Sequence, residues 1–233
     1  MNSIVALLVS LMVSMGVQLA PGETKQQQED HYTRIAQDVV SVVYDPHVAP
    51  LYSGPYGRIK TALLVIAIMN YESDYRQEVD DGTVRGDNGK SWCLGQVKLG
   101  KPRKNNTKLH AYVDPKGYFG LTKDPRVGWR GQDLVQDRTK CIKIIVAASR
   151  TSFFVMKRRG YKHPNWLNIY TSGKYNKGGE ASSLRVNLAV RWWRQIPTEE
   201  TDESVLARLT QQRLLQEAVF FQPQSAQNRT RAL

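Results

Sequence analysis

One run of the sequence is apolar at almost every position before it ends in a carboxyl and a hydroxyl group: RIKTALLVIAIMNYES, residues 58–73. A helix that is apolar on nearly every side belongs in the interior of a domain. The part from Leu64 to Ile68, taken alone, also fits a buried strand. We expect a buried central helix that ends near Glu72.

The residues after this run predict a change of structure. Asp74 to Asp124 is rich in Gly, Asp, Asn and Pro, which favours turns and short strands over a long helix. Helical spacing of apolar residues resumes from Asp133 to Met156, and Ser182 or Ser183 would cap a last helix. Residues 51–196 therefore predict one mainly α domain, with a buried central helix and an irregular or short-stranded insert lobe.

Both ends of the chain are expected to lie outside this domain. Residues 1–20 are apolar from Ile4 onward, which fits an export signal or a membrane anchor, or else a helix buried against a partner protein. Residues 21–50 predict a polar linker and a short helix. Residues 197–233 predict a C-terminal helix, from about Ser204 to Phe220, and a flexible tail.

The charge of the chain favours an anionic partner. Thirty-three Lys and Arg against 21 Asp and Glu leave a formal net charge of +12, and 41% hydrophobic residues are enough to form a core. Such a charge suits nucleic acid, lipid headgroups or an acidic wall polymer. No helix-turn-helix, zinc-finger or RNA-binding motif is present, so we expect no specific nucleic-acid reading. Two loops gather many of the cations: Lys98, Lys101, Arg103, Lys104 and Lys108 in one, and Lys157, Arg158, Arg159 and Lys162 in the other.

Cysteine and histidine residues predict no metal or cofactor site. Two Cys are too few for a disulfide scaffold or a four-ligand zinc site, and the four His have no metal-ligand spacing. Cys141 falls on the apolar face of a helix, where it either packs as a small hydrophobe or pairs with Cys93 in an oxidising compartment.

Glu72 is the strongest candidate for chemistry. It follows the apolar run and precedes the irregular insert, so its carboxyl group would leave an apolar wall and face a cleft built from loops. Desolvation there would raise its pKa, which a general acid for glycosidic cleavage requires. The alternative is a surface glutamate at a helix end, paired with Arg76 or another cation.

Further motifs follow Glu72-Ser73 in a characteristic order. They are Gly86-Asp87-Asn88-Gly89, then Ser91-Trp92-Cys93-Leu94-Gly95-Gln96-Val97, and much later Tyr170-Thr171-Ser172-Gly173. This order and spacing resemble the lysozyme-like superfamily, and within it the lytic transglycosylases and goose-type lysozymes. Their pattern is Glu-Ser at a helix end, then Gly-Leu-Met-Gln, then Tyr-Asn-x-Gly opening a late helix.

The resemblance covers roughly Arg58 to Gln195 and departs from the family in two places. Residues 93–97 keep the Leu and the Gln but replace Gly and Met, and residues 170–173 keep the Tyr and the Gly but not the Asn. Residues 175–178, Tyr-Asn-Lys-Gly, are a competing match for the last motif. We prefer Tyr170, because a helical stretch around residues 166–169 would lead into it.

The resemblance implies that residues 51–196 form a lysozyme-like catalytic domain, a lytic transglycosylase that cleaves the MurNAc–GlcNAc β-1,4 bond of peptidoglycan. Glu72 would protonate the glycosidic oxygen and then take the proton of the substrate's own C6 hydroxyl, which closes a 1,6-anhydro ring. Ser73 and Gln96 would contact the sugars, and Tyr170 would orient Glu72 through a hydrogen bond. No cofactor is implied.

Two other interpretations stay open. A muramidase would hydrolyse the same bond with a water positioned by Asp80, Asp81 or Asp87, although Asp in such a stretch is commonly a turn former. A non-enzymatic, structural or peptidoglycan-binding protein would dock into a larger assembly through the two ends of the chain. Because such enzymes serve phage virions and secretion machines, we expect a location in the cell envelope, the periplasm or a virion. Peptidoglycan is the expected partner, together with virion or secretion-system proteins.

Overall fold

The protein is mainly α-helical, as the sequence predicts. The computed structural model describes residues 3–99, 109–160, 165–173 and 179–196, and five single residues beyond them. The helices are α1 (Ser3–Val13), α2 (Lys25–Val43), α3 (Gly57–Ser73), α4 (Gln77–Asp80), α5 (Gly86–Gly89), α6 (Gly131–Gln136), α7 (Arg138–Arg158), α8 (Asn168–Ser172) and α9 (Gly179–Trp193), with a 3-10 turn at Asn165–Leu167. The strands are β1 (Ser91–Trp92), β2 (Val97–Lys98), β3 (His110–Val113) and β4 (Phe119–Thr122).

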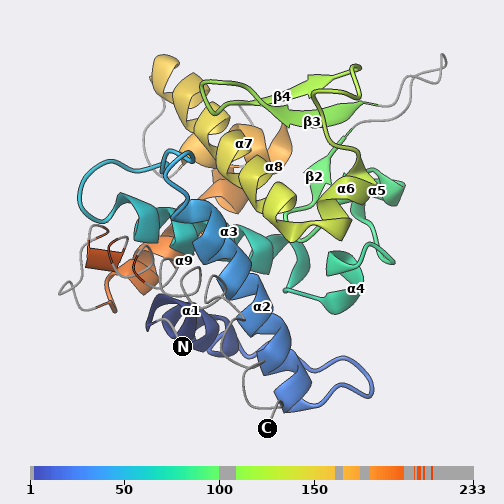
Figure 1. Cartoon of the computed structure of the whole chain (residues 1–233), viewed down its shortest axis with the longest axis vertical. Coiled ribbons are helices and arrows are strands. Elements are labelled where there is room, and N and C mark those ends of the chain that lie inside the picture. The colour runs from blue at the N-terminus through green and yellow to red at the C-terminus, as the bar shows by residue number, and fades with distance from the viewer. Residues whose placement is uncertain are drawn as a thin grey trace, which may run out of the picture. The chain divides into compact units, whose positions relative to one another are not determined.

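Helix α3 is the expected central helix, and no strand forms at Leu64–Ile68. Every side chain from Ala62 to Met69 is buried, because α2, α7 and α9 all pack against this helix (Figure 1). The apolar side chains on every side of α3 therefore pack against a neighbouring helix. The helix ends where Asp74 takes a left-handed conformation, with φ of 50°, and its N–H donates to the Asn70 carbonyl.

The second long helix is divided near its start. One helix was expected from Asp133 to Met156, but α6 ends before Asp137, which is extended and begins α7. The Asp137 side chain accepts a hydrogen bond from the Thr139 N–H at 3.0 Å, a usual N-cap arrangement. The break allows α7 to take its own direction across the domain.

The insert lobe consists of two small antiparallel hairpins, which confirms the expected short strands. Strand β1 pairs with β2, and β3 pairs with β4. The second hairpin lies along α7 (Figure 1), where the Phe119 N–H donates to Thr151 Oγ1 at 2.8 Å. Residues 100–108, which carry most of the first basic loop, lie outside the described residues.

The apolar N-terminal segment packs into the domain, which differs from the separate segment expected for residues 1–20. The chain forms two compact units, Met1–Ile196 and Pro197–Leu233, so α1 belongs to the larger one. Helix α1 lies against α2 and α3, and its apolar side chains are buried there. The buried residues are Ile4, Val5, Leu8, Leu11 and Met12. Across the described residues, no helix is both long enough and apolar enough to cross a bilayer.

Helix α2 also begins earlier than expected, inside the polar stretch assigned to a linker. Thr24 and Gln27 form a capping box: the Gln27 N–H donates to Thr24 Oγ1 and the Thr24 N–H donates to Gln27 Oε1. This Thr-x-x-Gln signal was present in the sequence. The helix then buries Ile35, Val39 and other apolar residues before ending at Val43, close to the expected position.

The last helix of the larger unit, α9, begins at Gly179, before the expected caps at Ser182 or Ser183. Ser182 Oγ instead accepts a hydrogen bond from the Leu167 N–H at 3.1 Å, which ties α9 to the preceding 3-10 turn. In the smaller unit the structure describes only Asp202, Ser204, Val205, Ala207 and Gln211, and each is helical. The remainder of the expected C-terminal helix and tail lies outside the described residues.

Candidate active site

A cavity of about 680 Å³ brings together the motifs that are far apart in the sequence. Glu72 comes from the end of α3, Gln96 from the turn between β1 and β2, and Tyr170 from α8. Ala148 and Thr151 of α7 form part of the wall. Pockets that hold small ligands commonly have volumes of ~300–1,000 Å³, so the cavity has room for a substrate.

Glu72 lies on the wall of this cavity, and its side chain is only 19% exposed. Burial raises the pKa of the Glu72 carboxyl above its ordinary value, because desolvation disfavours the charged form. The cation Arg185 opposes this shift and the nearby Asp87 charge adds to it, but desolvation dominates. The expectation of a carboxyl group with a raised pKa at the end of the central helix is confirmed.

The partner of Glu72 is Arg185 on α9, a residue that sequence reasoning missed. Arg185 Nη2 and Nε donate to Glu72 Oε1 at 2.9 and 3.2 Å. Its Nη1 donates to the Ala181 carbonyl at 2.7 Å, so the guanidinium is fixed. Arg76, the partner considered from the sequence, instead lies 3.7 Å from Glu78.

One sequence signal could have revealed Arg185. The apolar face of α9 includes Val186, Leu188, Ala189 and Trp192, and helical spacing places Arg185 on that same buried face. A buried arginine is almost always paired. The sequence therefore predicts a buried acidic partner for Arg185. No sequence pattern identifies that partner as Glu72, which is 113 residues away.

Gln96 is part of the framework of the cavity wall. Its Oε1 accepts a hydrogen bond from the Gly86 N–H at 3.0 Å, and its Nε2 donates to the Cys93 carbonyl at 3.3 Å. A Cβ atom on residue 86 would lie 2.1 Å from Gln96 Oε1, so only glycine permits this approach. The predicted sugar-binding residue thus lines the cavity and also joins α5 to the β1–β2 turn.

Tyr170 also lines the cavity, but its hydroxyl group has a different partner from the one expected. It donates to the Gly95 carbonyl at 2.7 Å rather than orienting Glu72. Burial raises the pKa of the Tyr170 phenol well above its ordinary value, and the charge of Glu72 adds to the shift. Tyr170 remains neutral and holds the β1–β2 turn against α8. The competing match at residues 175–178 lies outside the described residues.

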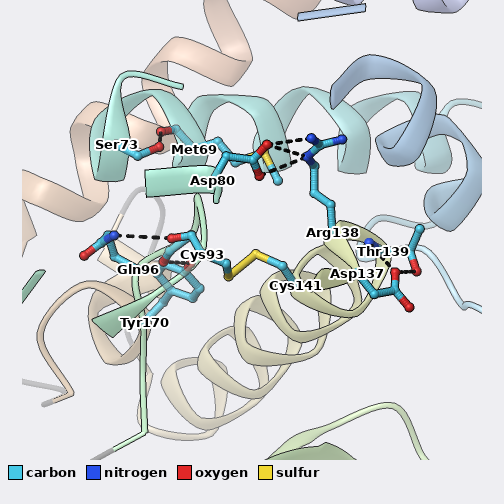
Figure 2. Close-up of a disulfide and its surroundings, with 11 residues drawn as sticks. Met69, Ser73, Asp80, Cys93, Gln96, Asp137, Arg138, Thr139, Cys141 and Tyr170 are labelled. Carbon is cyan, nitrogen blue, oxygen red and sulfur yellow. Dashed lines mark hydrogen bonds and ion pairs between the residues drawn. A yellow bond between two sulfur atoms is a disulfide. The ribbon is translucent and has the colours of Figure 1, made fainter. Parts of the chain in front are cut away.

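The β1–β2 turn is also held by a disulfide between Cys93 and Cys141 of α7, so the open question of pairing is answered. Figure 2 shows Cys93, Gln96 and Tyr170 together on one side of this bond. Cys93 and Gln96 have φ values of 57° and 47°, a left-handed conformation that non-glycine residues rarely adopt. Such strain persists where surrounding contacts impose it, and it is common at functional sites.

Ser73 does not face the cavity, although it was expected to contact sugars. Its side chain is buried and its hydroxyl group donates back to the Met69 carbonyl at 2.8 Å (Figure 2). Ser73 is not among the residues that line the cavity. In this structure the Ser73 hydroxyl group helps to end α3, and the sugar contact expected of it stays a prediction without support from the cavity lining.

Only one of the three candidate aspartates reaches the cavity. Asp80 is buried in an ion pair with Arg138 (Figure 2), and Asp81 accepts a hydrogen bond from the Thr83 N–H at 2.9 Å in a turn. Asp87 lines the cavity, 2.9 Å from Lys98 Nζ. The hydrogen bond from Lys98, with a second one from Ser91, lowers the pKa of the Asp87 carboxyl.

The described residues contain no group of three or more metal-ligating side chains. Comparisons of the chain with protein-family models, curated proteins and solved structures find no match.

Proposed function

We propose that this protein is a lytic transglycosylase that cleaves the MurNAc–GlcNAc β-1,4 bond of peptidoglycan and leaves a 1,6-anhydroMurNAc product. The observation that carries the proposal is Glu72, a carboxyl group with a raised pKa on the wall of a cavity large enough for sugars. A general acid needs its proton near neutral pH and a substrate within reach. The raised pKa of Glu72 is a shift toward the first requirement, and its place on the cavity wall meets the second.

The reaction needs one carboxyl group and no water. Glu72 donates its proton to the glycosidic oxygen as the bond from that oxygen to C1 of MurNAc breaks. The C6 hydroxyl oxygen of the same sugar bonds to C1, and its proton passes to the Glu72 carboxylate. The acid is thereby regenerated, and the two products together contain the same atoms as the strand that was cut.

Arg185 suits the second half of this cycle. Once Glu72 has given up its proton, the carboxylate is charged in a desolvated place, which is unfavourable by itself. The guanidinium 2.9 Å away stabilises that charge. Burial raises the pKa of Glu72 and Arg185 lowers it, so burial favours the protonated form of the first step and Arg185 favours the charged form of the second.

Asp87 is poorly suited to be a general base. Its carboxylate accepts hydrogen bonds from Lys98 and Ser91, and they lower its pKa. A base with a lowered pKa takes up protons less readily. This property argues against Asp87 as a general base that activates water, whereas a nucleophilic carboxylate would keep a lowered pKa.

Two further features agree with a substrate in the cell wall. Peptidoglycan carries carboxylates on its peptides, and the chain has a net charge of +12, with Lys98 lining the cavity. The Cys93–Cys141 disulfide is typical of proteins that work in oxidising compartments. We therefore propose that the protein acts in the cell envelope or in a virion that acts on it.

A muramidase is the second candidate, because Asp87 lies on the same cavity and its charge raises the pKa of Glu72. Carboxyl pairs whose pKa values are shifted apart are common in glycosidases. Asp87→Asn distinguishes the two. A transglycosylase should retain most of its activity in this variant, whereas a muramidase that uses Asp87 should lose it as completely as Glu72→Gln does.

Mass spectrometry of the soluble products of wall digestion tests the proposal directly. Products ending in 1,6-anhydroMurNAc are expected, and reducing-end products, heavier by one water, would establish hydrolysis instead. Glu72→Gln should lower turnover by at least ~10²-fold without unfolding the protein. Glu78→Gln is the matched control, because Glu78 is outside the cavity. A wild-type rate in Glu72→Gln would overturn the assignment of the site.

A further inference from the structure

A second hollow lies on the C-terminal half of α7, away from the candidate active site. It has a volume of about 510 Å³, and Leu51 and Tyr118 complete it beside the helix. We call it the α7 groove, defined by Leu51, Tyr118, Arg150, Phe153, Phe154, Lys157 and Arg158. Its helical members recur three or four positions apart, which places them on one face of α7.

This face is distinct from the one that borders the active-site cavity. Ala148 and Thr151 line that cavity, whereas Arg150, Phe153 and Phe154 line the α7 groove. At about 100° per residue, the two sets lie roughly 140° apart around the helix axis. Among the described residues, the two hollows share α7 but no lining residue, and Tyr118 of the groove directly precedes Phe119 of the active-site cavity.

Two aromatic rings in the α7 groove are partly exposed to solvent. Phe153 and Phe154 are 38% and 37% exposed. Their positions are fixed by packing, since Phe153 lies edge-on to Trp166 and Phe154 contacts Tyr118, with ring centroids 5.6 and 5.2 Å apart. Rigid rings with one open side are suited to contact with a ligand.

The charge in the groove has a single sign. Arg150, Lys157 and Arg158 line it, and among the described residues that line the groove there is no carboxylate. The Arg158 guanidinium lies 4.2 Å from the Phe154 centroid, and Lys157 Nζ lies 6.0 Å from that of Phe153. In the described part of the chain neither Lys157 nor Arg158 forms a salt bridge.

Arg150 has a different role from the other two cations. Its Nη2 donates to the carbonyls of Ala49 and Pro50, the second at 2.9 Å. These bonds hold the segment that carries Leu51 and so fix one wall of the groove. The groove is therefore preformed, and Lys157 and Arg158 are the two cations that can contact a ligand.

We propose that the α7 groove binds an anionic strand of peptidoglycan next to the strand in the active-site cavity. Stem-peptide carboxylates would meet Lys157 and Arg158, and the apolar faces of the sugars would lie on Phe153 and Phe154. A concave site of this size suits a ligand segment, whereas insertion into a bilayer needs apolar side chains that protrude. The choice of ligand depends on the proposed function, but the binding can be measured without cleavage.

The test measures retention of the full-length protein on purified sacculi, in a Glu72→Gln background that prevents digestion. Lys157→Gln with Arg158→Gln should weaken binding about tenfold, the scale expected when charge-assisted hydrogen bonds are lost. The matched control removes one Lys and one Arg from α2, Lys25→Gln with Arg34→Gln, because both side chains are exposed there. It changes net charge equally and should retain most of the binding.

A second pair of measurements separates the outcomes. With Glu72 intact, the Lys157→Gln/Arg158→Gln variant should digest sacculi more slowly but cleave short soluble glycans at the wild-type rate. Equal losses in the groove and control variants would show an effect of net charge alone and overturn the proposal. If the Lys157→Gln/Arg158→Gln variant no longer sediments with phosphatidylglycerol vesicles but is still retained on sacculi, the groove binds lipid and the proposal is wrong. If the protein cleaves no wall but its retention still depends on Lys157 and Arg158, the groove is a binding site and the proposed enzymatic activity is wrong.

Discussion

Arg185 holds one carboxylate oxygen of Glu72 with two nitrogen atoms, at 2.9 and 3.2 Å, and joins α9 to the end of α3. The pKa of Glu72 is nevertheless raised, because desolvation outweighs the cation. The pair therefore sets the pH at which the carboxyl group loses its proton, and through it the pH range of any acid catalysis.

Arg185→Met is expected to move the alkaline limit of kcat/KM to higher pH. A general acid is active when protonated, so its activity falls as pH rises through its pKa. Arg185 lowers the pKa of Glu72, and its removal should therefore raise that pKa and extend the protonated range upward. Turnover at the wild-type optimum should fall roughly tenfold, since Glu72 loses its fixed position. The pH–rate profile is the measurement.

Arg185→Lys is the companion variant, because it keeps the charge but loses the two-nitrogen contact. Its alkaline limit should lie between those of the wild type and Arg185→Met. An unchanged limit in Arg185→Met, in a protein that remains folded, would contradict electrostatic control of Glu72 by Arg185.

Gly86→Ala should distort the active-site cavity, although residue 86 has no side chain that could act in catalysis. The added Cβ would lie 2.1 Å from Gln96 Oε1, so the Gln96 amide must move and its bond to the Gly86 N–H is lost. We expect kcat/KM to fall ~10-fold or more, because cavity groups are displaced by a sizeable fraction of an ångström. Steady-state kinetics on soluble glycan would measure the effect.

Gly179→Ala provides the control for this substitution. A Cβ at residue 179 would make only ordinary contacts, the nearest at 3.5 Å from Asn165. Stability and activity should both remain close to wild type. Equal effects of the two alanines would exclude a specific role for the close approach between Gly86 and Gln96.

Reduction of the disulfide should destabilise the domain and loosen the β1–β2 turn. The bond joins residues 48 positions apart, and the loop-entropy model gives a stabilisation of about 4 kcal/mol for such a loop. Cys93→Ser with Cys141→Ser should lower the free energy of unfolding by up to that amount. Urea denaturation with and without reductant measures it, and the double variant should no longer respond to reductant.

Helix α1 is expected to be an integral part of the folded domain. Leu8 is fully buried, and its truncation leaves a cavity among apolar side chains. Leu8→Ala should lower the free energy of unfolding by about 2–5 kcal/mol. Leu19→Ala is the control, because that side chain is 46% exposed and its loss should have little effect. Equal melting temperatures for Leu8→Ala and wild type would instead show that α1 is dispensable.

His31 should make the protein less stable as the pH falls. Burial lowers the pKa of His31 below 6.5, with Asp80 and the bond to the Tyr75 carbonyl opposing the shift. The unfolded chain therefore binds a proton at a higher pH than the native protein does. The contribution of neutral His31 to stability is present above pH ~6.5 and is lost as pH falls below that value.

His31→Gln should remove this part of the pH dependence, since its amide can still donate to Tyr75 but does not titrate. His47→Gln is the control, because His47 is exposed. Denaturant unfolding between pH 7.5 and pH 5 would measure the slopes. A wild-type slope in His31→Gln would show that another group is responsible.

The sequence by itself predicted the elements whose residues interact over short distances. The central helix, the spacing of α2 and α7 and the short strands of the insert follow from local periodicity and turn composition. The raised pKa of Glu72 was also predicted from the apolar run that leads into this carboxyl group, although the same residues fitted a surface glutamate at a helix end.

Only the tertiary structure decided which distant groups meet. The partners of Glu72 and Tyr170 are Arg185 and the Gly95 carbonyl, at separations of 113 and 75 residues, and no local pattern specifies such pairs. The same holds for Asp80, which is buried against Arg138, whereas Asp87 faces the cavity. Aspartates of the same insert have different roles, because the packing of helices determines which positions face a cleft and which face a neighbour.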